Sequence, residues 1–177
     1  MTLLLLARHG ETDWNRDGRF QGHADPPLND VGRRQSLDLA RRLAEVELTA
    51  IYSSDLSRAL ETAEIVAATR GLTVIPEPGL REIDVGSWSG LTRAEIADRF
   101  PNAHVHDGES TEGFRERIVT TVTRIVRAHP GDHVLLVSHG GCVRAVQRHA
   151  LGEPLPLLEN GGSYPLRYEN GGFRPLE

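Results

Sequence analysis

The chain has 177 residues, 38% of them hydrophobic and 25% charged, and a formal net charge of −5, and this length predicts one compact domain over residues 1–177. The acidic balance disfavours a nucleic-acid partner, which normally requires a basic face, and no apolar run approaches the roughly 20 residues that a membrane span needs. Because Cys142 is the single cysteine, an internal disulfide is excluded, and we expect a cytoplasmic protein.

In chain order, short apolar runs alternate with longer amphipathic stretches, which is typical of an α/β domain with a mainly parallel sheet. The pattern predicts strands at Leu3–Ala7, Thr49–Ser53, Thr73–Ile75 and His133–Val137, and two short strands between Ser163 and Phe173, joined across Glu169-Asn170-Gly171-Gly172. It predicts helices at Asp30–Val46, Leu56–Arg70, Thr92–Phe100, Thr111–His129 and Gly141–Leu151.

The helix expected at Thr111–His129 carries one apolar stripe, because its apolar residues recur at spacings of three and four. Such a stripe is typical of a helix that packs on a core, so we assign no functional role to its members, Phe114, Ile118, Val122, Ile125 and Val126.

Two His-Gly pairs follow strands. Arg8-His9-Gly10 comes after Leu3–Ala7, and Ser138-His139-Gly140-Gly141 comes after His133–Val137. If both strands are parallel members of one sheet, their carboxyl ends meet at one edge, where His9 and His139 can face each other.

At a third place, candidate site residues again follow the carboxyl end of a predicted strand. The strand Thr49–Ser53 leads through Ser54-Asp55 into a helix with Arg58 in its first turn. Arg8 and Arg58 would then share a crevice with the two histidines, and the helix N-termini after Asp55 and Gly140 would add backbone donors that favour an anion.

These residue types are the ones that phosphoryl transfer through a histidine requires. A neutral imidazole can attack phosphorus when its other ring nitrogen donates to a fixed acceptor. All 20 basic residues are Arg, which excludes a P-loop lysine and a Schiff base and suits a bidentate grip on oxyanions. The sequence therefore predicts a nucleophilic His9 with arginines holding the phosphoryl group.

An acid must protonate the leaving oxygen and later accept a proton from water. Glu82, in a loop after the strand Thr73–Ile75, is the first candidate, because the charge of a bound phosphate favours the protonated form of a nearby carboxyl. Asp84 and Glu11 compete for the role, and spacing alone does not choose among them.

At this point the chain resembles the histidine phosphatase superfamily, also called the phosphoglycerate-mutase-like family. A first signature and five further segments agree in type and order. The first signature is Arg8-His9-Gly10-Glu11-Thr12-Asp13-Trp14-Asn15. The further segments are Gln21-Gly22-His23-Ala24-Asp25-Pro26-Pro27-Leu28, Ser53 to Ala63, Leu80-Arg81-Glu82 with Gly86 and Gly90, Gly108-Glu109-Ser110, and Ser138-His139-Gly140-Gly141.

The resemblance implies a three-layer α/β/α fold with a mainly parallel central sheet and a reaction that uses no metal and no cofactor. It implies that His9 becomes transiently phosphorylated and that Glu82 is the proton donor and acceptor. The same resemblance implies phosphate or substrate contacts for Arg8, Asn15, Gln21, Gly22, Arg58, Glu82, His139 and Gly140. The alternative role for Asn15 and Gln21 is to cap or order their own loop.

Within the family the chain looks like the small phosphatases, such as the alpha-ribazole and broad-specificity phosphatases. The stretch 97–111, where mutases carry a long insertion, is short and Lys-free, and this favours hydrolysis of a small phosphorylated metabolite. The alternatives are a cofactor-dependent phosphoglycerate mutase and a non-catalytic module that binds phosphorylated ligands. The oligomeric state is left open between monomer and homodimer.

Three other features invite a functional interpretation. In His104-Val105-His106-Asp107 the acid directly follows the second histidine, so the segment is interpreted as a solvated lid rather than a metal site, with His106 in possible reach of the substrate. Cys142 is expected to be a small core residue of its helix. Trp88 is expected either in the core or in the pocket wall.

Overall fold

The computed structural model describes residues 1–102, 107–153 and 155–176, and within them one sheet has six strands in the order β3-β2-β4-β1-β5-β6. Strands β1 to β4 run parallel, whereas β5 is antiparallel to β1 and β6 is antiparallel to β5. The predicted α/β fold with a mainly parallel sheet is confirmed. The strands are β1 (Thr2–Arg8), β2 (Ala50–Ser53), β3 (Val74–Pro76), β4 (His133–Ser138), β5 (Ser163–Glu169) and β6 (Gly172–Pro175).

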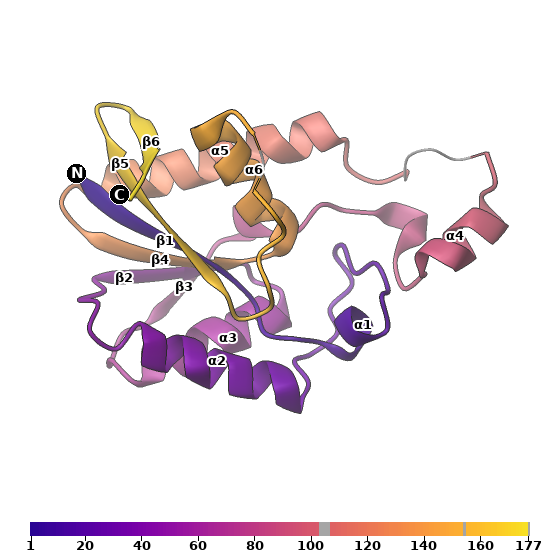
Figure 1. Ribbon diagram of the computed structural model, residues 1–177, viewed down its shortest axis with the longest axis horizontal. Coiled ribbons are helices and arrows are strands. Elements are labelled where there is room, and N and C mark those ends of the chain that lie inside the picture. Colours follow the sequence, from indigo (N-terminus) through magenta and orange to yellow (C-terminus); the bar gives the residue numbers. More distant parts are fainter. Residues whose placement is uncertain (103–106, 154, 177) are drawn as a thin grey trace.

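Helices cover both faces of the sheet, which gives the three layers (Figure 1). Helices α2 and α3 pack together on one face, and α5 and α6 pack together on the other. The helices are α1 (Asp13–Arg16), α2 (Asp30–Arg42), α3 (Ser57–Ala68), α4 (Arg93–Arg99), α5 (Thr111–Ala128) and α6 (Gly140–Leu151), with 3-10 turns η1 (Pro78–Leu80) and η2 (Gly86–Trp88).

The two faces of the sheet have separate cores because side chains alternate along each strand. In β1, Leu4 and Leu6 belong to the core under α5 and α6, whereas Leu5 and Ala7 belong to the core under α2 and α3. The apolar stripe predicted on α5 is buried in the first of these cores. A strand buried on both faces explains the unbroken apolar run that opens the sequence.

Most element boundaries agree with the sequence prediction within two residues, but the helix predicted at Asp30–Val46 ends at Arg42. The prediction was wrong there because Leu43 continues the apolar pattern, and its side chain is buried under the sheet although the helix has ended. The chain beyond it forms tight turns, in which the amide of Val46 donates to Leu43 O. The guanidinium of Arg70 donates to the carbonyls of Leu43 and Val46, which replaces their helical partners.

The predicted C-terminal hairpin is present as β5 and β6, joined through Asn170 and Gly171. Both residues have positive φ, 51° and 79°, as a two-residue hairpin turn requires. The short elements α1, η1 and η2 were not predicted, because four or fewer residues carry no periodic signal.

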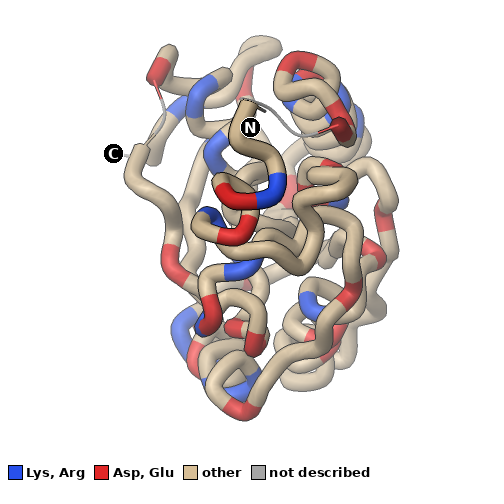
Figure 2. Tube along the Cα trace, turned by 90° about the vertical axis from the view of Figure 1, so that its right-hand side faces the viewer, with Lys and Arg blue, Asp and Glu red and all other residues tan. Residues whose placement is uncertain are grey.

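The carboxyl ends of β1 and β4 point to the side of the sheet where α1 and α4 lie (Figure 1). Viewed from that side, acidic and basic residues are interspersed along the trace (Figure 2). None of the helices in the described ranges combines the length and the apolar character that crossing a membrane demands.

Candidate active site

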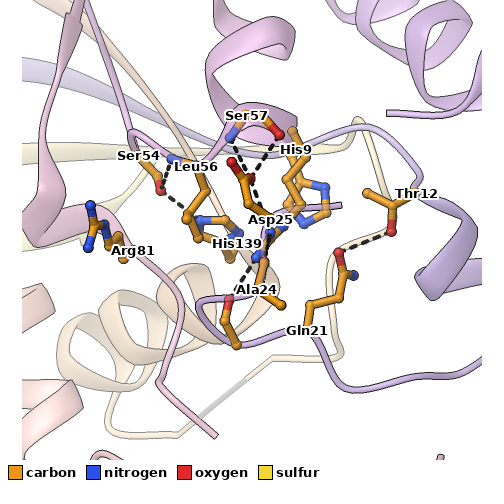
Figure 3. Close-up of polar contacts among 12 residues, drawn as sticks. His9, Thr12, Gln21, Ala24, Asp25, Ser54, Leu56, Ser57, Arg81 and His139 are labelled. Carbon is orange, nitrogen blue, oxygen red and sulfur yellow. Dashed lines mark hydrogen bonds and ion pairs between the residues drawn. The ribbon is translucent and has the colours of Figure 1, made fainter. Parts of the chain in front are cut away.

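The register of the sheet brings the two histidines together. Arg8 on β1 pairs with Ser138 on β4, so His9 and His139 each lie one residue beyond the same rung. Their ring centroids are 5.1 Å apart and the ring planes are inclined by 63°. Figure 3 shows the two imidazoles beside each other. Both side chains are almost fully buried, with exposures of 3% for His9 and 1% for His139.

One ring nitrogen of His9 is held by the protein. Its Nδ1 lies 2.6 Å from Gly10 O, and because a carbonyl oxygen only accepts, Nδ1 must carry the hydrogen. In the neutral ring the lone pair is therefore on Nε2, which makes Nε2 the nucleophilic atom. The backbone of His9 is fixed too, because its amide donates to Ser138 O and its carbonyl accepts from Asn160 Nδ2.

The surroundings keep His9 neutral. Burial lowers its pKa well below 6.5, and the positive charges of Arg58 and Arg8 act in the same direction against the hydrogen bond to Gly10. Burial and the charge of Arg58 likewise lower the pKa of His139. Both rings are therefore uncharged at neutral pH.

His139 is held by Ser54, which directly follows β2. Its Nε2 lies 2.9 Å from Ser54 Oγ, and Ser54 Oγ accepts from the amide of Leu56 (Figure 3). Nδ1 of His139 is buried and has no hydrogen-bond partner among the described residues. One ring nitrogen thus anchors the side chain and the other is left for a ligand.

Arg58 is 1% exposed, in the first turn of α3. Its two terminal nitrogens donate to Ala24 O (2.8 Å) and Gly22 O (2.9 Å), and Asp25 Oδ1 lies 3.9 Å from Nη1. Burial lowers the pKa of Arg58 to about 10, against the opposing charges of Glu82 and Asp25, so the guanidinium remains protonated at neutral pH. A buried positive charge thus stands beside the two neutral rings.

Arg8 occupies the end of β1 but does not line the cavity described below. Its Nη1 donates to Leu158 O at 2.8 Å, and its Nε is buried with no partner among the described residues. Burial lowers the pKa of Arg8, and the charge of Glu82 opposes this. Its charge therefore acts on the site from behind the lining.

Glu82 is the carboxylate that the fold places in the site. Its two oxygens accept from the amides of Ile83 (2.9 Å) and Gly141 (3.0 Å). The competing carboxylates are used elsewhere, since Asp84 accepts from the amide of Gly86 and Glu11 accepts from Asn29 Nδ2. Neither of them lines the cavity.

A cavity of about 310 Å³ joins these groups. It brings together seven of the nine residues predicted for the site and leaves out Arg8 and Gly140. Its lining consists of His9, Asn15, Arg19, Phe20, Gln21, Gly22, Arg58, Glu82, Ile83, Val85, His139 and Gly141.

The predicted anion-binding amides at the two helix N-termini are in part occupied by carboxylates of the protein. The amide of Gly141, in the first turn of α6, donates to Glu82, and the amide of Ser57, which opens α3, donates to Asp25 Oδ1 at 2.7 Å. The positive helix ends therefore stabilise side chains around the site as well as any ligand.

Asn15 and Gln21 line the cavity while they order the loop that carries them. Asn15 Oδ1 accepts from the backbone and hydroxyl of Thr12, which caps the short helix α1. Gln21 Oε1 lies 3.0 Å from the same hydroxyl (Figure 3). Asn15 thus takes part in the helix cap, and Gln21 helps to order the loop, which is the alternative role considered for them.

Arg117, on α5, fixes the Glu82 loop and was not identified from the sequence. It pairs with both carboxylate oxygens of Glu109 (2.7 and 2.8 Å) and donates to the carbonyls of Gly79, Arg81 and Glu82. The bonds from Arg117 lower the pKa of Glu109, so this pair stays ionised. The sequence pattern of this helix indicates only its apolar stripe, so Arg117 on the polar side could not be recognised from it.

Asn160 was also missed. It lies after α6 in a segment without periodic pattern, yet its Nδ2 donates to His9 O (3.0 Å) and lies 3.3 Å from Asn15 Oδ1. The neighbouring Gly161 amide also bonds the carbonyls of Arg8 and His9. The only signal in the sequence was the turn-forming Asn160-Gly161-Gly162 run.

The remaining residues considered in the sequence analysis are Cys142, Trp88, His104 and His106. Cys142 is buried, as predicted, and burial raises the pKa of its thiol. Trp88 packs edge-on against Phe20, with ring centroids 5.9 Å apart. His104 and His106 lie outside the described residues. Within the described ranges no three His, Cys, Asp or Glu side chains are arranged to hold a metal ion.

Comparison with known proteins links this geometry to one family. The sequence model of the histidine phosphatase superfamily (branch 1) matches residues 4–177. Among curated proteins, the chain is 39% identical over 160 residues to a metal-independent phosphoserine phosphatase of Arabidopsis thaliana, covering 82% of this chain and 67% of the relative. It is 38% identical over 161 residues to phosphoglycerate mutase-like protein 4 of the same plant, covering 83% and 70%. Among solved structures, YhfR of Bacillus stearothermophilus superposes with a TM-score of 0.91 at 34% identity, covering 98% of this chain and 94% of the other.

Proposed function

Because the chain belongs to the histidine phosphatase superfamily, we propose that it hydrolyses small phosphate monoesters through a phosphoryl group carried on Nε2 of His9. Membership in this family makes the chain a phosphomonoesterase that acts on small phosphorylated substrates, as the sequence predicted. The assignment of individual residues to steps of the reaction is our proposal.

The observation that carries the proposal is the hydrogen bond from Nδ1 of His9 to Gly10 O. It fixes the tautomer with a free Nε2, and burial keeps that nitrogen unprotonated. A histidine that only bound an anion would do better protonated, with both nitrogens donating. The environment of His9 instead suits attack on phosphorus.

In the first step the Nε2 lone pair forms a bond to phosphorus while the ester P–O bond breaks. Glu82, protonated, gives its proton to the departing oxygen and leaves the free alcohol. The phosphoryl oxygens gain charge, and we assign their stabilisation to Arg58 and to Nδ1 of His139, which carries the hydrogen when the Ser54 hydroxyl donates to Nε2. Arg8 adds positive charge from behind the cavity.

In the second step water attacks phosphorus and the P–N bond breaks. Glu82, now a carboxylate, takes the proton from the water, and inorganic phosphate leaves. His9 returns to its neutral form and Glu82 to its acid form, so the cycle closes without a further proton donor.

The proposed substrates are small, because a cavity of about 310 Å³ accommodates a phosphate with a short organic group. The curated relatives are named as a phosphoserine phosphatase and as a mutase-like protein. We propose water rather than a second substrate as the phosphoryl acceptor, because the stretch 97–111 is short.

A phosphate-release screen tests the proposal. It covers phosphoserine, phosphoglycerates, sugar phosphates, nucleotides and alpha-ribazole phosphate, each with and without EDTA. We expect release from several esters, unchanged by EDTA and abolished by His9→Asn. Isomerisation of phosphoglycerate that requires a bisphosphate primer and outpaces hydrolysis would instead indicate a mutase, and tight phosphate binding without turnover would indicate a binding module.

A further inference from the structure

A second hollow adjoins the active-site cavity on the side of Glu82. It has a volume of about 250 Å³ and lies between the start of α5 and the stretch of α6 from Gly141 to Arg148. Ile83 and Gly141 line both spaces, so they form the wall between them. Three arginines line the second hollow, Arg115, Arg144 and Arg148.

The helices set this arrangement. Arg144 and Arg148 lie one turn apart on α6, and Gly141 precedes Arg144 by three residues, so all three share one face of the helix. Arg115 comes from the first turns of α5, which packs against α6. The positive charges thus face one groove from two sides.

These three arginines differ from Arg117 and Arg124 of α5, because none of the three has an acidic partner within 4.0 Å in the part of the chain that the structure describes. Arg117 and Arg124 on the same helix pair with Glu109 and Glu77. Arg115 and Arg148 also line an adjoining hollow together with Glu112 and Glu116, yet among the described residues no ion pair within 4.0 Å joins these glutamates to the three arginines. The groove therefore offers exposed guanidinium groups with unused donors.

In the proposed reaction, the leaving group of the ester lies on the side of the cavity that faces this groove. Glu82 protonates the leaving oxygen, so the leaving group lies on its side of the phosphorus. The Glu82 carboxylate is held by the amides of Ile83 and Gly141, the residues that form the shared wall. The far end of a leaving group on the Glu82 side would therefore lie toward this wall, with the arginines beyond it.

We propose that Arg115, Arg144 and Arg148 form a subsite for a second anionic group on the leaving group. The substrate class is then a phosphate ester that also carries a carboxylate or a second phosphate. The inference rests on the proposed function, which sets the orientation of the ester. Guanidinium groups suit both anions, because each offers two oxygens to a planar fork of donors.

The test compares esters that differ only at the far end. One pair is 3-phosphoglycerate with glycerol 3-phosphate, for the carboxylate, and the other is fructose 1,6-bisphosphate with fructose 6-phosphate, for the second phosphate. The ratio of kcat/KM within each pair is measured for the natural sequence, for Arg144→Gln/Arg148→Gln and for Arg115→Gln. The matched control is Arg34→Gln/Arg41→Gln, which removes the same charge from α2 on the opposite face of the sheet (Figure 1).

We expect the preference for the doubly anionic ester to fall about tenfold in Arg144→Gln/Arg148→Gln, mainly through KM, and by less than about twofold in the control. The pair that responds identifies the anion as carboxylate or phosphate. A preference unchanged in the groove variants, or reduced equally in the control, would overturn the subsite.

Dissociation constants of the same esters for His9→Asn separate this inference from the proposed function, because binding needs no turnover. If no ester is hydrolysed but the binding preference is present and lost with the groove arginines, the proposed function fails and the subsite stands. If the binding preference is absent, the subsite fails whatever the turnover.

Discussion

At the scale of single residues, the reactivity of His9 depends on two neighbours, Gly10 and Arg58, and on its burial. Gly10 O fixes its tautomer, burial removes water, and the charge of Arg58 disfavours a proton on the ring. The same burial and charge act on His139. Neutral histidines in the folded state have a consequence for stability that is independent of any substrate.

We predict that the protein loses stability as the pH falls through 6.5. Below that pH the unfolded chain protonates His9 and His139, whereas the folded chain does not, because their pKa values are lowered well below 6.5. The unfolded state therefore binds more protons, and the free energy of unfolding decreases. Each histidine contributes a slope approaching about 1.36 kcal/mol per pH unit.

Urea unfolding between pH 5 and pH 8 measures this dependence, and the comparison with His139→Gln isolates one histidine from other titrating groups. The variant should show the shallower slope below pH 6.5. Equal slopes in both proteins would mean that His139 is protonated in the folded state as well.

Gly141→Ala should displace the proposed acid without altering its chemistry. A Cβ on Gly141 would lie 2.3 Å from Glu82 Oε1, so the carboxylate must move. We expect hydrolysis of an alkyl phosphate to fall by roughly 10²-fold, and that of p-nitrophenyl phosphate to fall much less, because nitrophenolate leaves without protonation. The control is Gly172→Ala, where nothing lies within 4 Å of the added Cβ. An equal loss on both esters would argue against Glu82 as the proton donor.

Sequence reasoning identified the site residues that follow strands. His9 and His139 could be predicted because each directly follows the carboxyl end of a parallel strand, and Arg58 because it lies in the first turn of the helix after another. Glu82 was first among three carboxylates, and its two amide donors single it out only in three dimensions. Asn160 could not be predicted, since its contact with His9 spans 151 residues and no pattern marks it.

At the scale of elements, α5 connects the core to the reactive loop. Its apolar face is buried under the sheet, while Arg117 on its polar side holds the carbonyls of Gly79, Arg81 and Glu82. Helix α5 therefore stabilises the fold and also sets where Glu82 stands.

Arg117→Lys should lower stability by about 1–3 kcal/mol, because lysine cannot replace the paired contacts to Glu109 and leaves carbonyls unsatisfied. The matched control is Arg124→Lys on the same helix, whose pair with Glu77 is more exposed, and it should cost no more than about 0.5 kcal/mol. Thermal unfolding measures the stability, and alkyl phosphate hydrolysis by Arg117→Lys should fall through kcat. Similar stability losses in both variants would remove any special role for Arg117.

Element existence was easier to predict than element ends. Strands and long helices have clear periods in the sequence. The end of α2 could not be predicted from local sequence, because Arg70, which follows α3, bonds the carbonyls of Leu43 and Val46 beyond that end. The 3-10 turns η1 and η2 flank the Glu82 loop and are too short for a periodic signal.

At the scale of the whole molecule, one sheet separates two cores, and its central strands contribute to both. Leu135 belongs to the core under α2 and α3, and its neighbour Leu136 belongs to the core under α5 and α6. The strand order β3-β2-β4-β1-β5-β6 could not be obtained from the sequence, because a strand pattern does not identify its neighbours. We propose that residues 1–177 unfold as one unit, since the active site takes residues from helices on both faces of the sheet, Arg58 from α3 and Gly141 from α6.

Leu135→Ala and Leu136→Ala test this proposal from the two sides. Both side chains are buried, so each change should cost about 2–5 kcal/mol. Circular dichroism follows the whole fold. Tryptophan fluorescence follows the site, because Trp88 packs against Phe20 of the cavity lining and Trp14, the other tryptophan, lies on α1. The two signals should keep a common midpoint in each variant. Separate midpoints would show that the site and the rest of the fold unfold independently.

The most direct test of the account is to trap the phosphorylated enzyme. The protein is mixed with a substrate found in the phosphate-release screen and quenched within milliseconds in alkali, where a phosphorus–nitrogen bond persists, and the peptides are sequenced by mass spectrometry. The account predicts phosphate on His9 during turnover, lost on acidification, and neither phosphopeptide nor turnover in His9→Asn. Phosphate on another residue, or undiminished hydrolysis by His9→Asn, would contradict it.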